Sequence, residues 1–110
     1  QAHTQVFDRL RPVSFIGHAH LTLIFGVSER RVFQVEAQDL KPNGEARFIV
    51  NVGSVGQPRD RDPRACYAVW DHDAERLEYV RVPYDIDTAA SKIMAAGLDE
   101  KFAKRLFMGV

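Results

Sequence analysis

The chain has 110 residues, with fifteen basic and fifteen acidic side chains and a formal net charge of zero. This length fits one small domain or a piece of a larger one, and the balanced charge excludes a general electrostatic attraction to nucleic acid or to an anionic membrane. No apolar run approaches the ~20 residues of a membrane-spanning helix, and no signal peptide opens the chain. The single cysteine, Cys66, excludes an internal disulfide and fits a reducing compartment, so we expect a cytoplasmic protein.

The first elements predicted along the chain are the end of a helix and a strand. Val6, Phe7 and Leu10 lie at helical spacing, and this helix is expected to stop near Pro12. The apolar run Val13–Ile16 then predicts a buried strand.

Two histidines follow this strand directly. Gly17 has no Cβ and lets the backbone turn out of the sheet, and His18 and His20 come next, two residues apart. In extended backbone that spacing places both imidazoles on one side. Neutral imidazoles there could serve one metal ion, or two metal ions about 3.5–4 Å apart. The alternative is a surface turn with two polar side chains, one of them hydrogen-bonded to the backbone.

The middle of the chain predicts three further strands. Residues 21–27 and 31–37 are expected to form a hairpin at the edge of a sheet. A turn at residues 41–44 precedes a strand over residues 48–52. That strand and Val13–Ile16 are apolar on both sides, which is typical of central strands covered on two faces.

A second hairpin and two short helices complete the predicted elements. Residues 66–70 and 77–82 are expected to pair over a turn in which His72 is solvated. The helices are expected to begin at Asp85 or Asp87 and at Asp99. Their apolar stripes are interpreted as packing surfaces: Ile86, Ala90, Ile93 and Met94, then Phe102, Ala103, Leu106 and Phe107.

Two stretches of the sequence resemble one family. They are Gly17-His18-Ala19-His20 and the run from Asn51 to Ala65, which contains Gly-Ser-Val-Gly-Gln-Pro-Arg-Asp. Together they resemble the calcineurin-like metallophosphoesterases, in particular the bacterial branch related to diadenosine-tetraphosphatase-type enzymes. That family carries G-H-[TS]-H after a strand, and later a segment close to N-P-G-S-V-G-Q-P-R-D-G-D-P-R-A. The resemblance covers residues 11–84, and the longer segment is highly specific.

The chain also departs from the family pattern. Ala19 replaces a hydroxyl residue, Val52 a proline and Arg61 a glycine, and none of these positions is a metal ligand in the family. The family's D-x-H, G-D-x-x-D and G-N-H-[DE] motifs and a further histidine do not occur here. The chain also begins with Gln1 rather than methionine. We therefore expect residues 1–110 to be a single C-terminal portion of such an enzyme, without its N-terminal metal-binding half.

The resemblance implies a fold and an activity. The fold would be α/β (α+β-like), half of a four-layer α/β/β/α sandwich, mostly β-strands with two C-terminal helices. The complete enzyme would hydrolyse phosphate esters or phosphoanhydrides of small molecules with two divalent metal ions (Mn, Fe, Zn, Ni or Mg). His18 would bind one ion and His20 the other. No catalytic residue is assigned here, because the family's proton donor belongs to the missing G-N-H-[DE] segment.

The loop over residues 53–65 would supply substrate contacts. Arg59 and Arg64 could bind substrate phosphate, because a guanidinium group matches phosphate oxygens. Ser54 could offer a hydroxyl or backbone N–H to a residue that supports a ligand. Alternatively, the arginines and aspartates of this loop pair with one another and fix its shape.

Three kinds of function remain open from the sequence. In the first, the chain is half of a metallophosphoesterase that pairs with its N-terminal half and is inactive alone. In the second, it is a non-catalytic remnant that associates with a copy of itself. In the third, it binds a single metal ion through His18 and His20. Neither nucleic acid nor membrane is an expected partner. We favour the first.

Overall fold

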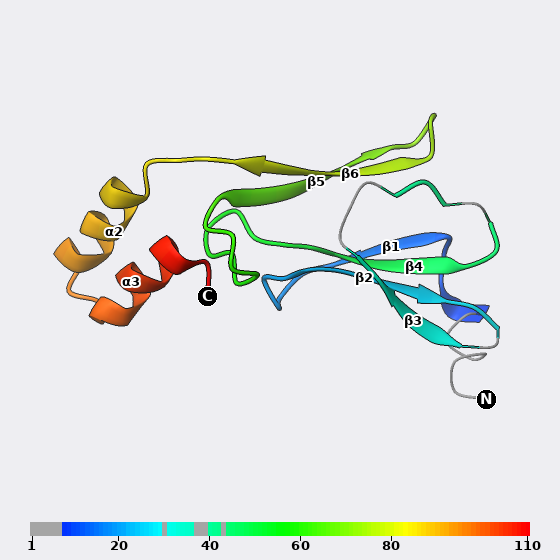
Figure 1. Ribbon diagram of the computed structural model, residues 1–110, viewed down its shortest axis with the longest axis horizontal. Coiled ribbons are helices and arrows are strands. Elements are labelled where there is room, and N and C mark those ends of the chain that lie inside the picture. The colour runs from blue at the N-terminus through cyan, green and yellow to red at the C-terminus, as the bar shows by residue number, and fades with distance from the viewer. Residues whose placement is uncertain (1–7, 30, 37–39, 43) are drawn as a thin grey trace.

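The computed structural model describes residues 8–29, 31–36, 40–42 and 44–110. The fold is mixed α+β, mostly strands with two helices at the C-terminal end, which confirms the predicted class (Figure 1). Of the predicted N-terminal helix, Asp8 and Arg9 are helical, and residues 1–7 lie outside the described part. The elements are β1 (Val13–Ile16), β2 (Thr22–Val27), β3 (Val32–Val35), β4 (Arg47–Val52), β5 (Ala65–Asp71), β6 (Arg76–Val82), α2 (Ile86–Ala95) and α3 (Glu100–Met108).

Four strands form one sheet in the order β1-β4-β2-β3, and β5 and β6 form a separate hairpin. β1 runs parallel to β4, whereas β2 runs antiparallel to both β4 and β3. The predicted hairpins are both confirmed, and β3 lies at a sheet edge as expected. β4 is central as predicted, but β1 lies at the other edge of the described sheet, so the prediction of a second central strand is wrong for these residues. On β1, Phe15 is 45% exposed and Ile16 47% exposed.

The core lies between this sheet and the hairpin. Ile24, Phe48 and Val50 of the sheet pack against Leu77 of β6, and all four side chains are buried. Figure 1 shows the hairpin lying along one side of the sheet. Alternation along β6 therefore points Leu77, Tyr79 and Arg81 in one direction, toward the sheet and the loop that follows β4.

The two helices have the predicted caps. The Asp85 carboxylate accepts a hydrogen bond from the N–H of Thr88, and that of Asp99 accepts one from Lys101, each 3.0 Å long. Gly97 and Gly109 follow the two helices with φ of +76° and +67°, a conformation that strains any residue with a Cβ.

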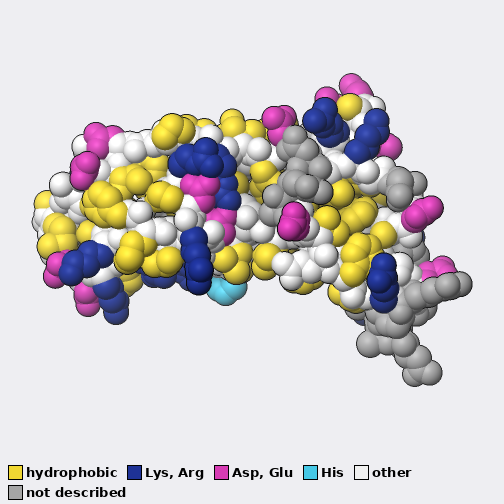
Figure 2. Space-filling model, in the orientation of Figure 1, with side chains coloured by type: hydrophobic (Ala, Val, Ile, Leu, Met, Phe, Trp, Pro, Cys, Tyr) yellow, Lys and Arg dark blue, Asp and Glu magenta, His cyan; other side chains and the backbone are white. Residues whose placement is uncertain are grey.

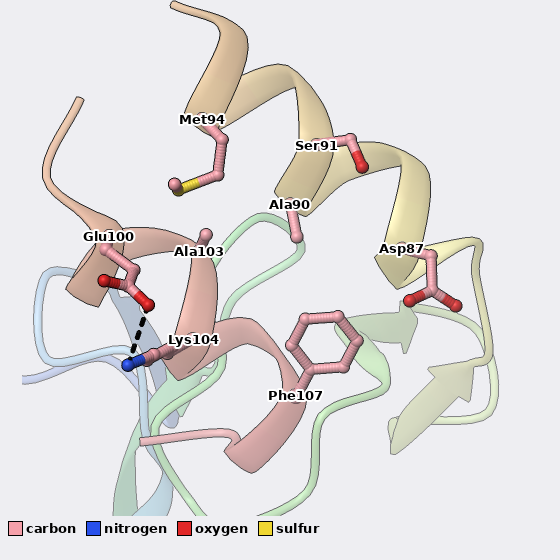
Figure 3. Close-up of a pocket in the computed structure, with 8 residues that line it drawn as sticks. All are labelled: Asp87, Ala90, Ser91, Met94, Glu100, Ala103, Lys104 and Phe107. Atoms are coloured by element: carbon pink, nitrogen blue, oxygen red, sulfur yellow. Dashed lines mark ion pairs between the residues drawn. The ribbon is translucent and has the colours of Figure 1, made fainter. Parts of the chain in front are cut away.

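The helix pair is only partly buried. Ala90, Ala103 and Leu106 are buried, but Met94 is 49% and Phe107 48% exposed, so the predicted apolar stripes are covered only in part. The reason is that α2 and α3 pack mainly on each other, beyond the strand ends (Figure 1). Figure 3 shows the open pocket between them, which Met94 and Phe107 help to line.

The molecule is extended for its length. Its radius of gyration is 16.7 Å and its dimensions are 50 × 31 × 18 Å. A compact domain of this size has a radius of gyration of about 13 Å. No helix among the described residues is long and apolar enough to cross a membrane.

Candidate metal centre

His18 and His20 lie in a bend that follows β1, not in extended backbone. Their φ angles are +77° and +61°, in the left-handed region that side chains with a Cβ seldom adopt, although histidine is among the residues found there more often. The extended geometry from which we predicted that both rings share one side is therefore wrong. Gly17, the residue expected to make the turn, does not have a positive φ, and a Cβ there would meet nothing within 4 Å.

The His20 side chain is oriented by the loop that follows β4. Its Nδ1 lies 2.9 Å from the carbonyl oxygen of Gln57. A carbonyl oxygen can only accept, so the neutral ring carries its proton on Nδ1 and its free lone pair on Nε2. Metal-binding histidines commonly make this same hydrogen bond, because it fixes both the tautomer and the ring orientation.

The backbone of His20 is bound by the same loop. The N–H of Arg59 donates to the carbonyl of His20 over 3.0 Å. The loop over residues 53–65 therefore lies against His20, and Arg59 on it is exposed. His18 is exposed in the adjacent bend, which the N–H of Ala19 closes by donating to Gly17 over 3.0 Å.

Ser54 shapes this loop. Its hydroxyl oxygen accepts a hydrogen bond from the N–H of Gln57 over 2.9 Å, and its carbonyl accepts one from Cys66 over 2.9 Å. These bonds close the turn that presents the Gln57 carbonyl to His20. Gly53 at the start of the loop has a φ of +81°, and a Cβ there would lie 3.0 Å from the Cys66 Sγ.

Asn51 connects the end of β4 to the histidine bend, a role that the sequence did not reveal. It is 4% exposed, and its Nδ2 donates to the carbonyl of Gly17 over 3.4 Å. Its own carbonyl accepts a 2.7 Å hydrogen bond from the Tyr79 hydroxyl. Burial raises the pKa of Tyr79 to about 12. The signal that could have indicated this role is that Asn51, a polar residue, lies at the end of an apolar strand.

The loop arginines differ in their partners. Arg64 makes two hydrogen bonds to the carboxylate of Asp62, 3.0 and 2.7 Å long, and these bonds lower the pKa of Asp62 to about 2. This pairing favours the loop-fixing interpretation for Arg64. The guanidinium of Arg59 instead donates to the amide oxygen of Gln57 over 3.0 Å. Because this amide is neutral, the contact does not compensate the charge of Arg59.

A second ion pair connects the loop to β6. Arg81 pairs with Asp60, and the Thr22 hydroxyl donates to the same carboxylate over 2.7 Å. Burial would raise the pKa of Asp60, but the hydrogen bonds from Arg81 and Thr22 lower it on balance. Figure 2 shows acidic and basic side chains lying side by side near the middle of the molecule. Arg81 was missed at the sequence level, although its alternation with Leu77 and Tyr79 could have indicated an inward cation.

By themselves, the described residues do not form a metal site. Nε2 of His20 is suited to a metal ion, because the hydrogen bond from Nδ1 fixes the ring and leaves the lone pair of Nε2 free. Among these residues, however, no three His, Cys, Asp or Glu side chains gather where one ion could bind them. Divalent ions take about four to six ligands, so an ion at His20 would need ligands from outside these residues.

No family model matches this chain. A crystal structure of a metallophosphoesterase from Sphaerobacter thermophilus matches with a TM-score of 0.81 and 34% identity, over 99% of this chain and 46% of that one. An uncharacterised protein of Methanocaldococcus jannaschii is 36% identical over 95 residues, which are 86% of this chain and 38% of that protein. The chain therefore spans less than half the length of either relative. Its fold is that of a metallophosphoesterase fragment.

Proposed function

We propose that this chain is the C-terminal part of a metal-dependent phosphoesterase that hydrolyses phosphate esters or phosphoanhydrides of small molecules. In this proposal it contributes His18 and His20 to a site for two divalent ions. The observation that carries the proposal is the hydrogen bond from Nδ1 of His20 to Gln57, which fixes the ring and leaves Nε2 available as a ligand. The Asn51–Ala65 stretch supports the finer proposal of the diadenosine-tetraphosphatase-like branch.

The residues of this chain would have separate tasks in such a site. Bound Mn, Fe, Zn, Ni or Mg ions would supply an activated hydroxide and charge stabilisation for phosphoryl transfer. His20 would present Nε2 in a fixed orientation, and the exposed Arg59 would bind phosphate oxygens beside it. Ser54 would support the site by closing the turn at Gln57, and Arg64 by pairing with Asp62.

The partner in this proposal is the N-terminal half of the same enzyme. The ligands that the described residues lack would come from it, and both relatives are more than twice as long as this chain. The exposed Phe15 and Ile16 on the edge strand offer apolar surface for that half to cover. The same surface would suit a copy of this chain, which is the alternative of a self-associating, non-catalytic module.

The test compares the chain alone with the chain joined to an N-terminal half that carries the D-x-H and G-N-H-[DE] motifs. With Mn²⁺ and bis(p-nitrophenyl) phosphate, we expect no turnover by the chain alone and metal-dependent turnover by the joined protein. His20→Ala should abolish turnover, whereas His72→Ala, in the exposed hairpin turn, should leave it unchanged. Turnover by the isolated chain, or full activity of joined His20→Ala, would overturn the proposal.

A further inference from the structure

We propose that Arg81 is a positioning residue for His20 and that it acts through Asp60 and Thr22. We call these three residues the Asp60 network. The inference rests on the proposed role of His20 as a metal ligand, but the orientation of the His20 ring can be measured without any metal.

The ion pair between Arg81 and Asp60 holds the loop against the hairpin. Nη2 of Arg81 donates to Oδ2 of Asp60, and Nη1 donates to Oδ1 over 3.3 Å. The two side chains are only 19% and 14% exposed, so water screens this pair less than a surface pair. Nε of Arg81 also lies 3.8 Å from the carboxylate of Asp62, which ties a second point of the loop to the same cation.

Thr22 joins the ion pair to the strand that follows His20. Its hydroxyl donates to Oδ2 of Asp60 over 2.7 Å and accepts from Nη2 of Arg81 over 3.3 Å. Thr22 is the first residue of β2, two positions after His20. The Asp60 carboxylate is therefore bound to β2 through Thr22 and to β6 through Arg81.

These contacts close a ring that contains His20. Two residues after His20 comes Thr22, whose hydroxyl donates a hydrogen bond to Asp60. Arg59, the residue before Asp60, donates its N–H to the carbonyl of His20 and so closes the ring. The carbonyl of Gln57, two residues before Arg59, accepts the hydrogen bond from Nδ1–H of His20. Both anchored atoms of His20, the carbonyl oxygen and Nδ1, thus depend on where Asp60 holds the loop.

Removing Arg81 should release this ring. A carboxylate left without its cation in a largely buried place is costly, and moving Asp60 toward water relieves that cost. Arg59 and Gln57 would move with it, because they are one and three residues away. The hydrogen bond that His20 Nδ1–H donates to the Gln57 carbonyl, which selects this tautomer, would then weaken, and Nε2 would lose its fixed direction.

The test uses Arg81→Met, with Arg76→Met as the matched control at the far end of β6, opposite Asp71. Imidazole ¹H–¹⁵N spectra of the folded, metal-free protein are recorded at mildly alkaline pH, so that neutral tautomers are compared. We expect a single Nδ1–H tautomer for His20 in the wild type and in Arg76→Met, and a mixture in Arg81→Met. Zn²⁺ affinity at His20 should fall about tenfold in Arg81→Met and stay unchanged in the control.

Thr22→Val is a second, milder variant, for use if Arg81→Met does not fold. It removes one hydroxyl from the Asp60 network and keeps a β-branched side chain in the strand. It should shift the tautomer ratio in the same direction by a smaller amount. Wild-type His20 spectra and Zn²⁺ affinity in both variants, even with lowered stability, would show that the Asp60 network is structural only and would overturn the inference. If the chain joined to an N-terminal half binds no Zn²⁺ through His20, the proposed metal role fails, and the tautomer comparison still decides the positioning role.

Discussion

The N–H of Arg61 donates a 2.8 Å hydrogen bond to the carbonyl of Gly109. This bond joins the loop over residues 53–65 to the end of the last helix. Gly109 is buried against the backbone of Asp62, so close that a Cβ would lie 2.8–2.9 Å from three backbone atoms of that residue. In Figure 1 the C-terminus accordingly ends beside the loop. The helix pair is thus connected to the loop that also binds His20.

Gly109→Ala should destabilise the protein more than Gly97→Ala. Both glycines have a positive φ, which costs an L-residue about 1–2 kcal/mol, but a Cβ on Gly97 would meet nothing within 4 Å. At Gly109 the contact with Asp62 adds an overpacking cost of about 1–3 kcal/mol. Urea unfolding of the two variants measures the difference, and equal losses would show that the loop does not depend on this close approach.

Much of the fold could be predicted because local signals and tertiary structure agree. The apolar run at Val13–Ile16 forms β1, and the two runs on either side of the polar residues 71–76 form the β5–β6 hairpin. Asp85 and Asp99 cap the helices because short acidic side chains satisfy free backbone N–H groups.

The site geometry was harder to predict because it depends on distant residues. His18 and His20 adopt positive φ, and the partner that orients His20 lies 37 residues further along the chain. Asp60 could be interpreted as pairing within its own loop, yet its cation comes from β6, 21 residues away. Sheet order likewise depends on long-range pairing, so the composition of β1 could not show that it lies at an edge.

Acid should destabilise the protein between about pH 4 and pH 2. The hydrogen bonds from Arg64 lower the pKa of Asp62 from 3.8 to about 2, so its stabilising contribution is complete above pH 4 and is lost as the pH falls toward 2. Asp60, whose pKa is also lowered, acts in the same direction. Urea midpoints measured across this range should fall less steeply for Asp62→Asn than for the wild type. Parallel profiles would contradict the assigned role of the Arg64–Asp62 pair.

Tyr79→Phe should weaken the connection between the hairpin and β4. Tyr79 donates 2.7 Å to the carbonyl of Asn51, and losing this bond should cost about 1 kcal/mol. Tyr67→Phe is the control, because that side chain is 43% exposed on the outer face of the hairpin and its loss should change stability by less than about 0.5 kcal/mol.

Tyr79 should also make the stability of the protein depend on pH in the alkaline range. Burial raises the pKa of Tyr79 to about 12, so the folded state favours the neutral phenol, and this contribution is lost as the pH rises from about 10 toward 12. The alkaline fall in stability should be smaller in Tyr79→Phe than in the wild type. An identical fall in both proteins would show that another group causes it.

The edge strand β1 should mediate association of the isolated chain. β1 is parallel to its one neighbour in the described sheet, and parallel strands are normally covered on both faces and paired on both sides. Ile16 is 47% exposed on it, and an exposed apolar edge strand promotes pairing with another chain.

We expect light scattering to give a mass above that of the monomer for the isolated chain. Ile16→Lys should raise the monomer fraction, because a charge on an edge strand opposes pairing. Val69→Lys, a similarly exposed position (43%) on the hairpin, should not. Joining the N-terminal half should suppress association of the wild type, since that half would cover the same edge. A wild-type chain that remains monomeric at all concentrations, or equal effects of the two lysine variants, would exclude β1 as the interface.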